Sequence, residues 1–241
     1  MTKPHVELQA PNGRLLTRVS PPDHGWHRAL WFAIKYVNGE NFWEEVEPFG
    51  DQFEVGDGRI EWRRPSGDVV IDETRTVVTD GYVTDWTTTL TPRVDVVLDR
   101  TPYTTWGGYG GLTLRGAADW SDTRILVADG SVHRRPEGVP SPWCDLSSDE
   151  CGLLFLDHPS NVRHPVPWYG ATRSRVYGDD GWSNYLNAAF LFHEPLSLRA
   201  GEELTLRYRV IAHDGAWAVG TCDRAWTNWA GGDRARSWVD G

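Results

Sequence analysis

Cysteine is scarce in this sequence, with three residues, Cys144, Cys151 and Cys222, in 241. An odd number of cysteines without a CxxC pair argues against a disulfide framework and against a zinc knuckle, so reduced, structural thiols are expected. No apolar run approaches the roughly 18 residues of a membrane span, and the first residues, MTKPHVELQAPNGRLL, show neither an apolar signal region nor a cleavage site. We therefore expect a cytoplasmic protein.

Positive charge is also in deficit. Lys and Arg number 24 against 34 Asp and Glu, which gives a formal net charge of -10. Such a surface repels phosphate backbones and anionic lipids, so nucleic acid and membranes are excluded as expected partners.

Helical periodicity is rare, and period-2 alternation of apolar and polar residues recurs along the chain. Leu204, Leu206, Tyr208 and Val210 alternate with polar residues, and the stretches 69–78 and 82–90 repeat the pattern. Turn pairs separate these stretches at hairpin-like spacing. They are Asn12-Gly13, Asn38-Gly39, Asp57-Gly58, Ser66-Gly67, Asp80-Gly81, Asp129-Gly130 and Ala200-Gly201. The sequence predicts an all-β fold, a two-sheet antiparallel β-sandwich.

No fixed-period repeat or low-complexity linker divides the chain, so a single domain is expected over residues 1–241, with 216–241 as a peripheral tail. Three apolar runs, 30–37, 153–156 and 188–192, suit central strands. Residues 131–149 are expected to form a long loop, and 216–230, with three tryptophans, is the one candidate helix, expected to cap an open end of the sandwich.

Tryptophan is unusually frequent, with 14 copies against one Met and 7 Phe. Some of these rings must belong to the core, but indole faces also stack on the C–H faces of sugars. Five tryptophans lie in or beside polar segments and are predicted to bind substrate: Trp26, Trp43, Trp106, Trp143 and Trp168.

Three segments, 23–28, 106–111 and 157–164, concentrate His, Trp, Asn and Gly. His24 and His27 lie three residues apart, just before a buried run, where imidazoles can act as acid and base near neutral pH. His158 and Asn161 follow another apolar run. HxxH without a flanking Glu lacks the zinc-protease pattern, so no cofactor is expected, and a divalent metal bound by histidines stays an alternative.

Two further charged residues fall on strand patterns. The Gly-rich stretch 107–111 lacks a GK[ST] ending and leads into a short strand with Arg115 at its end, which argues against a nucleotide site. Glu73 shares a strand face with apolar residues, where a charge is costly unless it is paired or used. A structural ion pair of Glu73 with Arg75 or Arg115 explains the pattern as well as catalysis does.

Several of these segments together resemble a known family of bacterial sandwich proteins, catalogued as the PmoA family with a methane-oxygenase label. The resemblance covers Lys3-Pro4-His5, DHGWHRALWFAIKYVNGENFW from Asp23, Asp72-Glu73-Thr74-Arg75, GGYGGLTLR from Gly107, Trp143-Cys144-Asp145 and DHPSNVRHPVPWYG from Asp157. It implies a fold similar to galactose-mutarotase-like supersandwiches and an association with sugar catabolism. Particulate methane oxygenase subunits are membrane proteins, and this chain has no membrane segment, so the oxygenase label does not fit.

The leading functional prediction is an intracellular carbohydrate-active enzyme that uses His and carboxylate acid–base chemistry for glycosidic cleavage or isomerisation. The rival is a non-catalytic carbohydrate-binding module. In the first case, His24, His27, Glu73, Arg115, His158 and Asn161 are expected to converge on one pocket. His27 or His158 would move a proton, Glu73 would be the carboxylate counterpart, and Arg115 and Asn161 would hold substrate oxygens. The expected partner is a small saccharide, and a homo-oligomer through the sandwich edges is an option.

Overall fold

The computed structural model describes residues 3–102, 108–175 and 181–236. The alternating stretches form antiparallel strands, as predicted, and their inward-facing residues make one large core between two sheets. The prediction of an all-β sandwich is confirmed.

The first sheet has six strands. In spatial order they are β1 (His5–Val6), β2 (Leu30–Ala33), β10 (Gly111–Arg115), β17 (Trp182–Ala188), β16 (Pro167–Ser174) and β13 (Glu137–Pro140). The second sheet has nine strands. They are β12 (Val132–His133), β11 (Arg124–Val127), β14 (Trp143–Ser147), β15 (Cys151–Asp157), β19 (Leu204–Asp214), β8 (Val83–Pro92), β7 (Val69–Asp80), β6 (Arg59–Arg63) and β5 (Asp51–Gly56).

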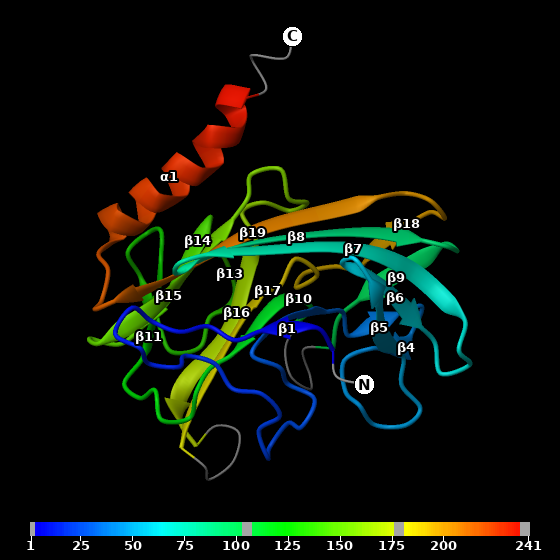
Figure 1. Ribbon diagram of the computed structural model, residues 1–241, viewed down its shortest axis with the longest axis horizontal. Coiled ribbons are helices and arrows are strands. Elements are labelled where there is room, and N and C mark those ends of the chain that lie inside the picture. Colours follow the sequence, from blue (N-terminus) through cyan, green and yellow to red (C-terminus); the bar gives the residue numbers. More distant parts are fainter. Residues whose placement is uncertain (1–2, 103–107, 176–180, 237–241) are drawn as a thin grey trace.

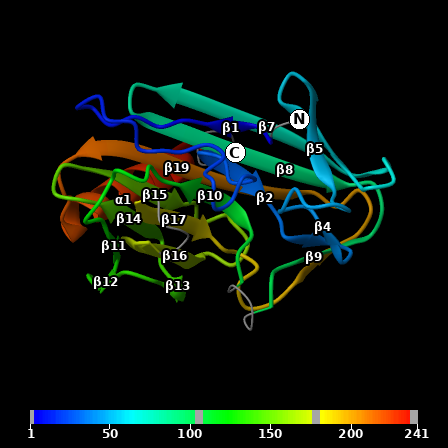
Figure 2. The ribbon, with the colours of Figure 1, turned by 90° about the horizontal axis from the view of Figure 1, so that it is seen from below.

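A third, four-stranded sheet, which the sequence did not predict, closes one end of the sandwich. Its strands are β18 (Leu196–Leu198), β9 (Val96–Asp99), β3 (Tyr36–Val37) and β4 (Glu40–Asn41). Figures 1 and 2 show the long strands β7, β8 and β19 running side by side across the molecule.

Each large sheet buries both of its faces over part of its area. Leu30 and Phe32 of β2 point into the core between the sheets, whereas Trp31 and Ala33 join a separate aromatic cluster on the outer face. In β15 of the other sheet, Leu153 and Phe155 enter the core, and the alternate residues join a cluster beneath the helix. Because successive side chains of a strand point to opposite faces, apolar residues form three layers: the core between the sheets and one cluster on the outer face of each large sheet.

The one helix of the described residues, α1 (Val219–Arg236), lies where the candidate helix was expected, but it covers the outer face of the nine-stranded sheet beside β14 rather than an open end. Trp217, Trp226 and Trp229 make this contact, and Figure 1 shows the far end of α1 pointing away from the body.

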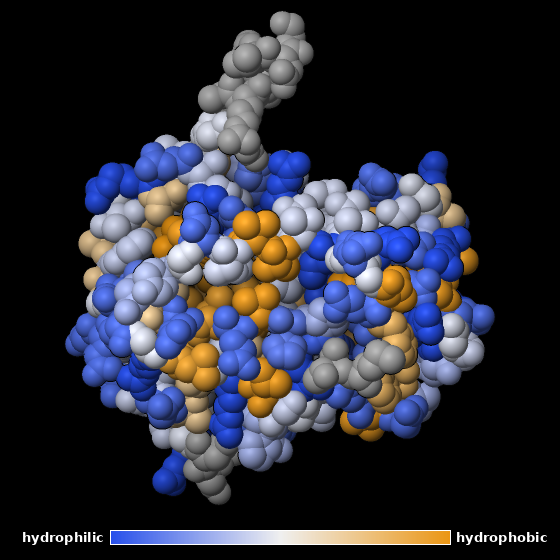
Figure 3. Space-filling model, viewed as in Figure 1, coloured by the Kyte–Doolittle hydropathy of each residue, from blue (hydrophilic) through white to orange (hydrophobic). Residues whose placement is uncertain are grey.

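Within the described residues, no helical segment has both the length and the apolar character of a membrane span. On the face seen in Figure 3, hydrophobic side chains gather in groups that hydrophilic side chains surround.

Two local predictions were wrong. Residues 131–149 hold β12, β13 and β14 instead of one long loop, because short strands separated by prolines give little periodic signal. The apolar run 188–192 is not a strand. It leaves β17 at Ala188 and turns at once, and Phe190 N donates to Ala188 O at 3.0 Å.

Candidate functional site

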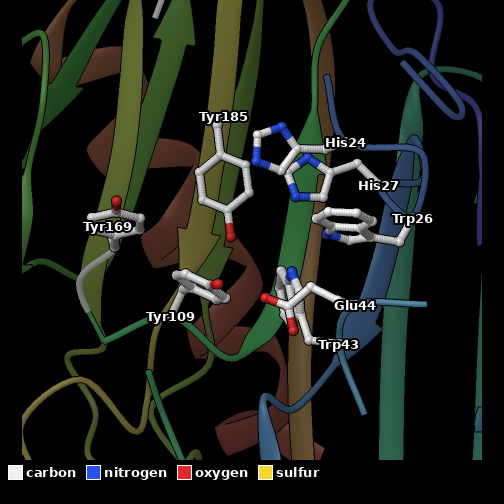
Figure 4. A pocket seen from close by; sticks show the side chains of 8 residues that line it. All are labelled: His24, Trp26, His27, Trp43, Glu44, Tyr109, Tyr169 and Tyr185. Carbon is white, nitrogen blue, oxygen red and sulfur yellow. The ribbon is translucent and has the colours of Figure 1, made fainter. Parts of the chain in front are cut away.

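A pocket of about 330 Å³ lies on the outer face of the six-stranded sheet. We call it the histidine–tyrosine pocket. Its lining residues are His24, Trp26, His27, Trp43, Glu44, Tyr109, Tyr169 and Tyr185. In Figure 4 the two histidines lie at one end of the pocket, and Glu44 and Tyr109 lie toward the other.

The histidines come from a tight loop, residues 20–28, which precedes β2. Two successive turns shape it, since His24 N donates to Pro21 O at 3.1 Å and His27 N donates to His24 O at 2.9 Å. Buried Arg28 fills the loop, donating to Gly25 O and to Ser20 Oγ at 2.8 Å. The turns bring His24 and His27 to the same side, where their rings stack at 4.6 Å with an interplanar angle of 20°.

This loop is tied to the segment that carries Trp43 and Glu44. Arg28 Nη2 donates to both oxygens of Glu45 at 2.8 and 2.9 Å, and the fully buried Lys3 Nζ donates to the same carboxylate at 3.1 Å. Buried ion pairs fix geometry more than they add stability. The Lys3–Glu45–Arg28 cluster therefore sets the spacing between the two walls of the pocket.

His24 is held by a carboxylate that the sequence did not nominate. Its Nδ1 donates to Asp23 Oδ2 at 2.7 Å, and Arg115 Nη2 donates to Asp23 Oδ1 at 2.9 Å. Because a carboxylate only accepts, Asp23 fixes the proton on Nδ1 and leaves Nε2 as the proton-exchanging nitrogen of His24. Arg115 thus supports the pocket from beneath, through Asp23.

His27 is 5% exposed and packs against Trp31 and Tyr185 at ring distances of 5.3 and 5.5 Å. Burial holds the pKa of His27 well below its usual 6.5, and the cations Arg115, Arg28 and Lys3, together with His24 whenever it is protonated, act in the same direction. Its ring is therefore neutral at pH 7. Its Nδ1 is buried and has no hydrogen-bond partner among the described residues.

The opposite wall is aromatic. Tyr169 and Tyr185 project from neighbouring strands β16 and β17, with ring centroids 5.9 Å apart. Tyr109 stacks near Tyr169 at 6.1 Å and lies 4.7 Å from Trp43. Tyrosine hydroxyls both donate and accept, and the rings offer apolar faces, a combination that suits a polyhydroxylated ligand.

Glu44 is the carboxylate among the described lining residues. An Asx turn positions it: Asn41 Oδ1 accepts from Glu44 N at 3.2 Å, and Asn41 Nδ2 donates to Glu44 O at 2.9 Å. Lys35 Nζ pairs with Glu44 Oε2. Glu44 is therefore a carboxylate with a fixed backbone and a neutralising partner.

Four of the predicted site residues line this one pocket, namely His24, His27, Trp26 and Trp43, and Arg115 supports it. The prediction that Glu73, His158 and Asn161 join them is wrong. Trp106 lies outside the described residues.

Glu73 lies in the core between the sheets, behind the six-stranded sheet. Its carboxylate accepts from Arg75 Nε at 2.6 Å and Nη2 at 2.9 Å, from Trp62 Nε1 at 2.8 Å and from Thr88 Oγ1 at 3.2 Å. The ion pair of Glu73 with Arg75, which the sequence offered as the alternative to a catalytic role, explains why this carboxylate is buried. These donors satisfy the buried charge, so it needs no substrate.

His158 and Asn161 lie on the other side of the molecule, beside α1. His158 packs edge-on against Trp229 at 5.1 Å. Asn161 Nδ2 donates to Asp157 Oδ1 at 2.8 Å and to Arg207 O at 2.7 Å, so its amide holds a turn. The segment 157–164 therefore contacts the helix and does not contribute to the pocket.

Trp143 and Trp168 are structural as well. Trp143 is fully buried beneath α1 and donates its Nε1 to Asp223 Oδ1 at 2.7 Å. Trp168 lies in the core between the sheets and donates to Ser141 O at 2.9 Å. Their predicted contact with substrate is therefore wrong.

Five residues of the site were not predicted from the sequence: Asp23, Glu44, Tyr109, Tyr169 and Tyr185. Asp23, Tyr109 and Tyr169 lie inside segments that were singled out, so the signal was present. Neither Tyr185 nor Glu44 lies in a sequence pattern that indicates a site. Tyr185 reaches the pocket only because β17 pairs with β16, where it lies opposite Ala171.

Metal binding gains no support from the described part of the chain, where no group of three or more His, Cys, Asp or Glu side chains is arranged to hold an ion.

Comparison with solved structures gives matches at low identity. The chain is similar to the heparan sulfate lyase HepC from Pedobacter heparinus (TM-score 0.43, 12% identity, 86% of this chain and 30% of that chain). It is also similar to an alpha-galactosidase from Lactobacillus brevis (TM-score 0.40, 11% identity, 90% of this chain and 30% of that chain). The chain thus spans under a third of these proteins.

Comparison with curated proteins finds no match. One family model matches residues 2–227, and its description is "Family of unknown function (DUF6807)".

Proposed function

We propose that this chain, which belongs to the DUF6807 family of unknown function, binds a small saccharide in the histidine–tyrosine pocket and transfers a proton on it. The observation that carries the proposal is the histidine pair, in which an Asp23-oriented His24 stacks on a buried, neutral His27 whose Nδ1 has no hydrogen-bond partner within the described part of the chain. A buried polar atom without a partner costs about 1–3 kcal/mol, and such atoms are often found at functional sites.

The lining supports a sugar as that ligand. The partly exposed Trp26 offers a ring face for the C–H face of a pyranose, Trp43 and the three tyrosines complete an aromatic lining, and Glu44 offers a partner for its hydroxyl groups. A concave pocket with a few convergent polar groups is the usual form of a small-molecule site.

The acid–base part of the proposal rests on His24. Its Nδ1 is held by Asp23, and its ring lines the pocket, so Nε2 can exchange a proton with a substrate group. This carboxylate–imidazole arrangement is the one that orients a catalytic histidine in many hydrolases. A cytoplasmic location, the PmoA-like resemblance and a homo-oligomeric state stay predictions from the sequence.

Isothermal titration calorimetry with a panel of mono- and disaccharides tests the binding. Trp26→Ala removes a partly exposed wall of the pocket and is expected to weaken binding about tenfold, or ~1.4 kcal/mol. Trp229→Ala, on the other side of the molecule, is the matched control and is expected to leave the affinity unchanged. No heat from any saccharide, or equal affinity in Trp26→Ala, contradicts the proposal. Binding without turnover of any bound sugar favours the binding-module alternative.

A further inference from the structure

We propose that the substrate carries a carbonyl group beside a C–H bond, as a sugar oxidised to the ketone level does, and that the histidine pair moves the proton of that carbon. This inference rests on the saccharide function proposed above. It specifies the substrate class and the reaction, which the sequence left open between cleavage and isomerisation.

The carboxylates near the pocket do not suit direct glycoside hydrolysis. That reaction ordinarily needs two carboxyl groups on either side of the bond, about 5–9.5 Å apart. Among the described residues that line the pocket, Glu44 is the one carboxylate, and Lys35 neutralises it. Asp23 is turned away toward His24 and Arg115, and Glu73 lies behind the sheet. Among the described residues that line the pocket, the nitrogen bases are therefore the two imidazoles.

The two imidazoles have different surroundings, which separates their roles. His24 is the accepting base, because the Asp23 carboxylate stabilises the imidazolium that forms when Nε2 takes a proton. The side chain of His24 is 25% exposed, so the imidazolium can pass its proton on to water. Arg115 holds Asp23 in place with a second contact at 2.8 Å.

His27 cannot take that role, because a buried ring beside several cations resists a further proton. The same surroundings favour an anion. Lys3 and Arg28 pair with Glu45, and Arg115 pairs with Asp23, so three cationic side chains lie at this end of the pocket. A neutral imidazole in such a place is a hydrogen-bond donor to a developing oxyanion, the role of the neutral histidine in triosephosphate isomerase.

The step follows from these roles. Nε2 of His24 takes the proton from the carbon next to the carbonyl, and the C–H electron pair forms a carbon–carbon double bond. The carbonyl π pair moves onto the oxygen, and the resulting enolate accepts a hydrogen bond from the N–H of His27. When His24 returns a proton to the same carbon, the substrate is regenerated with a hydrogen taken from solvent. This exchange is common to epimerisation, isomerisation and elimination.

Proton NMR in D₂O tests the inference. The substrates are methyl glucosides oxidised at C2, C3 or C4, together with D-fructose and D-tagatose, and unoxidised methyl glucoside is the control. The wild-type protein is expected to accelerate exchange of the C–H beside the carbonyl by at least ~100-fold over buffer. His24→Gln and His27→Gln are expected to lose the acceleration. His164→Gln, whose ring stacks on Trp226 beneath α1, is expected to retain it.

Binding of the same sugars is measured by calorimetry on each variant. Binding without exchange of any oxidised sugar overturns this inference and leaves the proposed function standing. Absence of binding by every saccharide overturns the proposed function itself. Exchange that survives in His24→Gln also overturns the inference, because it assigns the base elsewhere.

Discussion

At the scale of the residue, His27 is a basic group that folding keeps neutral. Burial lowers the pKa of His27 well below 6.5, so between the two pKa values its ring binds a proton in the unfolded chain and not in the folded chain. The contribution of His27 to stability is complete above its unfolded pKa of about 6.5 and is lost as the pH falls toward its folded pKa.

His27→Gln replaces this ring with a side chain that does not titrate. Below pH ~6.5, the free energy of unfolding of the wild type is expected to fall by up to about 1.4 kcal/mol per pH unit more steeply than that of the variant. Urea titrations of both proteins between pH 5 and pH 8 measure the difference. Two parallel stability curves would show that the imidazole is not kept neutral.

Asp23 is the residue that decides which nitrogen of His24 carries the proton. Asp23→Asn keeps the shape but replaces a pure acceptor with an amide, so both ring tautomers become accessible. Nitrogen-15 NMR of the imidazole is expected to show the Nδ1-protonated form in the wild type and a mixture in the variant. Turnover of an exchanging sugar is expected to fall ~100-fold or more, with little change in its binding. An unchanged tautomer means that Asp23 is merely structural.

At the scale of the element, the pocket depends on how closely β10 approaches the chain that follows β17. Gly111 has φ +123°, and a Cβ there would lie 2.5 Å from Ala188 O. The adjacent Gly110 N donates to Asn187 Oδ1 at 3.0 Å, which fixes the start of β10 just after Tyr109. A side chain at position 111 would therefore displace both strand and ring.

Gly111→Ala is expected to lower the free energy of unfolding by about 2–4 kcal/mol, because it adds strain and a backbone overlap. Gly232→Ala is the matched control, since nothing lies within 4 Å of the added Cβ in α1 and alanine favours the helix by up to about 1 kcal/mol. Denaturant midpoints of the two variants give the comparison. Equal stabilities would contradict the close approach.

At the scale of the whole molecule, the layers keep pocket and helix apart. The histidine–tyrosine pocket lies outside the six-stranded sheet, and α1 lies outside the nine-stranded sheet, with the main core between them. Trp226 fastens the helix by donating Nε1 to Asp157 O at 2.9 Å and by stacking on His164 at 5.9 Å. Stability and ligand binding should therefore be separable.

Trp226→Ala is expected to reduce the free energy of unfolding by about 2–3 kcal/mol, somewhat less than a fully buried Trp would, because this ring is partly exposed. Its saccharide affinity is expected to equal that of the wild type. Chemical denaturation and calorimetry on the same preparation check both values. A loss of affinity in the still-folded variant would link the helix to the pocket.

The sequence predicted strands well because alternation is local, and it predicted half of the site for the same reason. His24, Trp26 and His27 lie in one short loop, so their proximity in space follows from their proximity in sequence. Trp43 lies a short distance further along the chain. Glu73 and His158 are also polar residues beside apolar runs, but which layer a residue faces depends on sheet order and register. Tyr185 lies beside Tyr169 because β17 pairs with β16, and the spacing of residues along the sequence does not indicate this pairing.

The central claim, that a saccharide binds at the histidine pair, is tested most directly by NMR of the imidazole and indole signals during a sugar titration. The ring signals of His24 and His27 and the indole N–H signals of Trp26 and Trp43 are expected to shift together with one dissociation constant. The signals of His158, His164 and Trp229, on the far side, should stay in place. Shifts confined to that far group, or none at the histidine pair with any bound sugar, would show that the saccharide does not bind there.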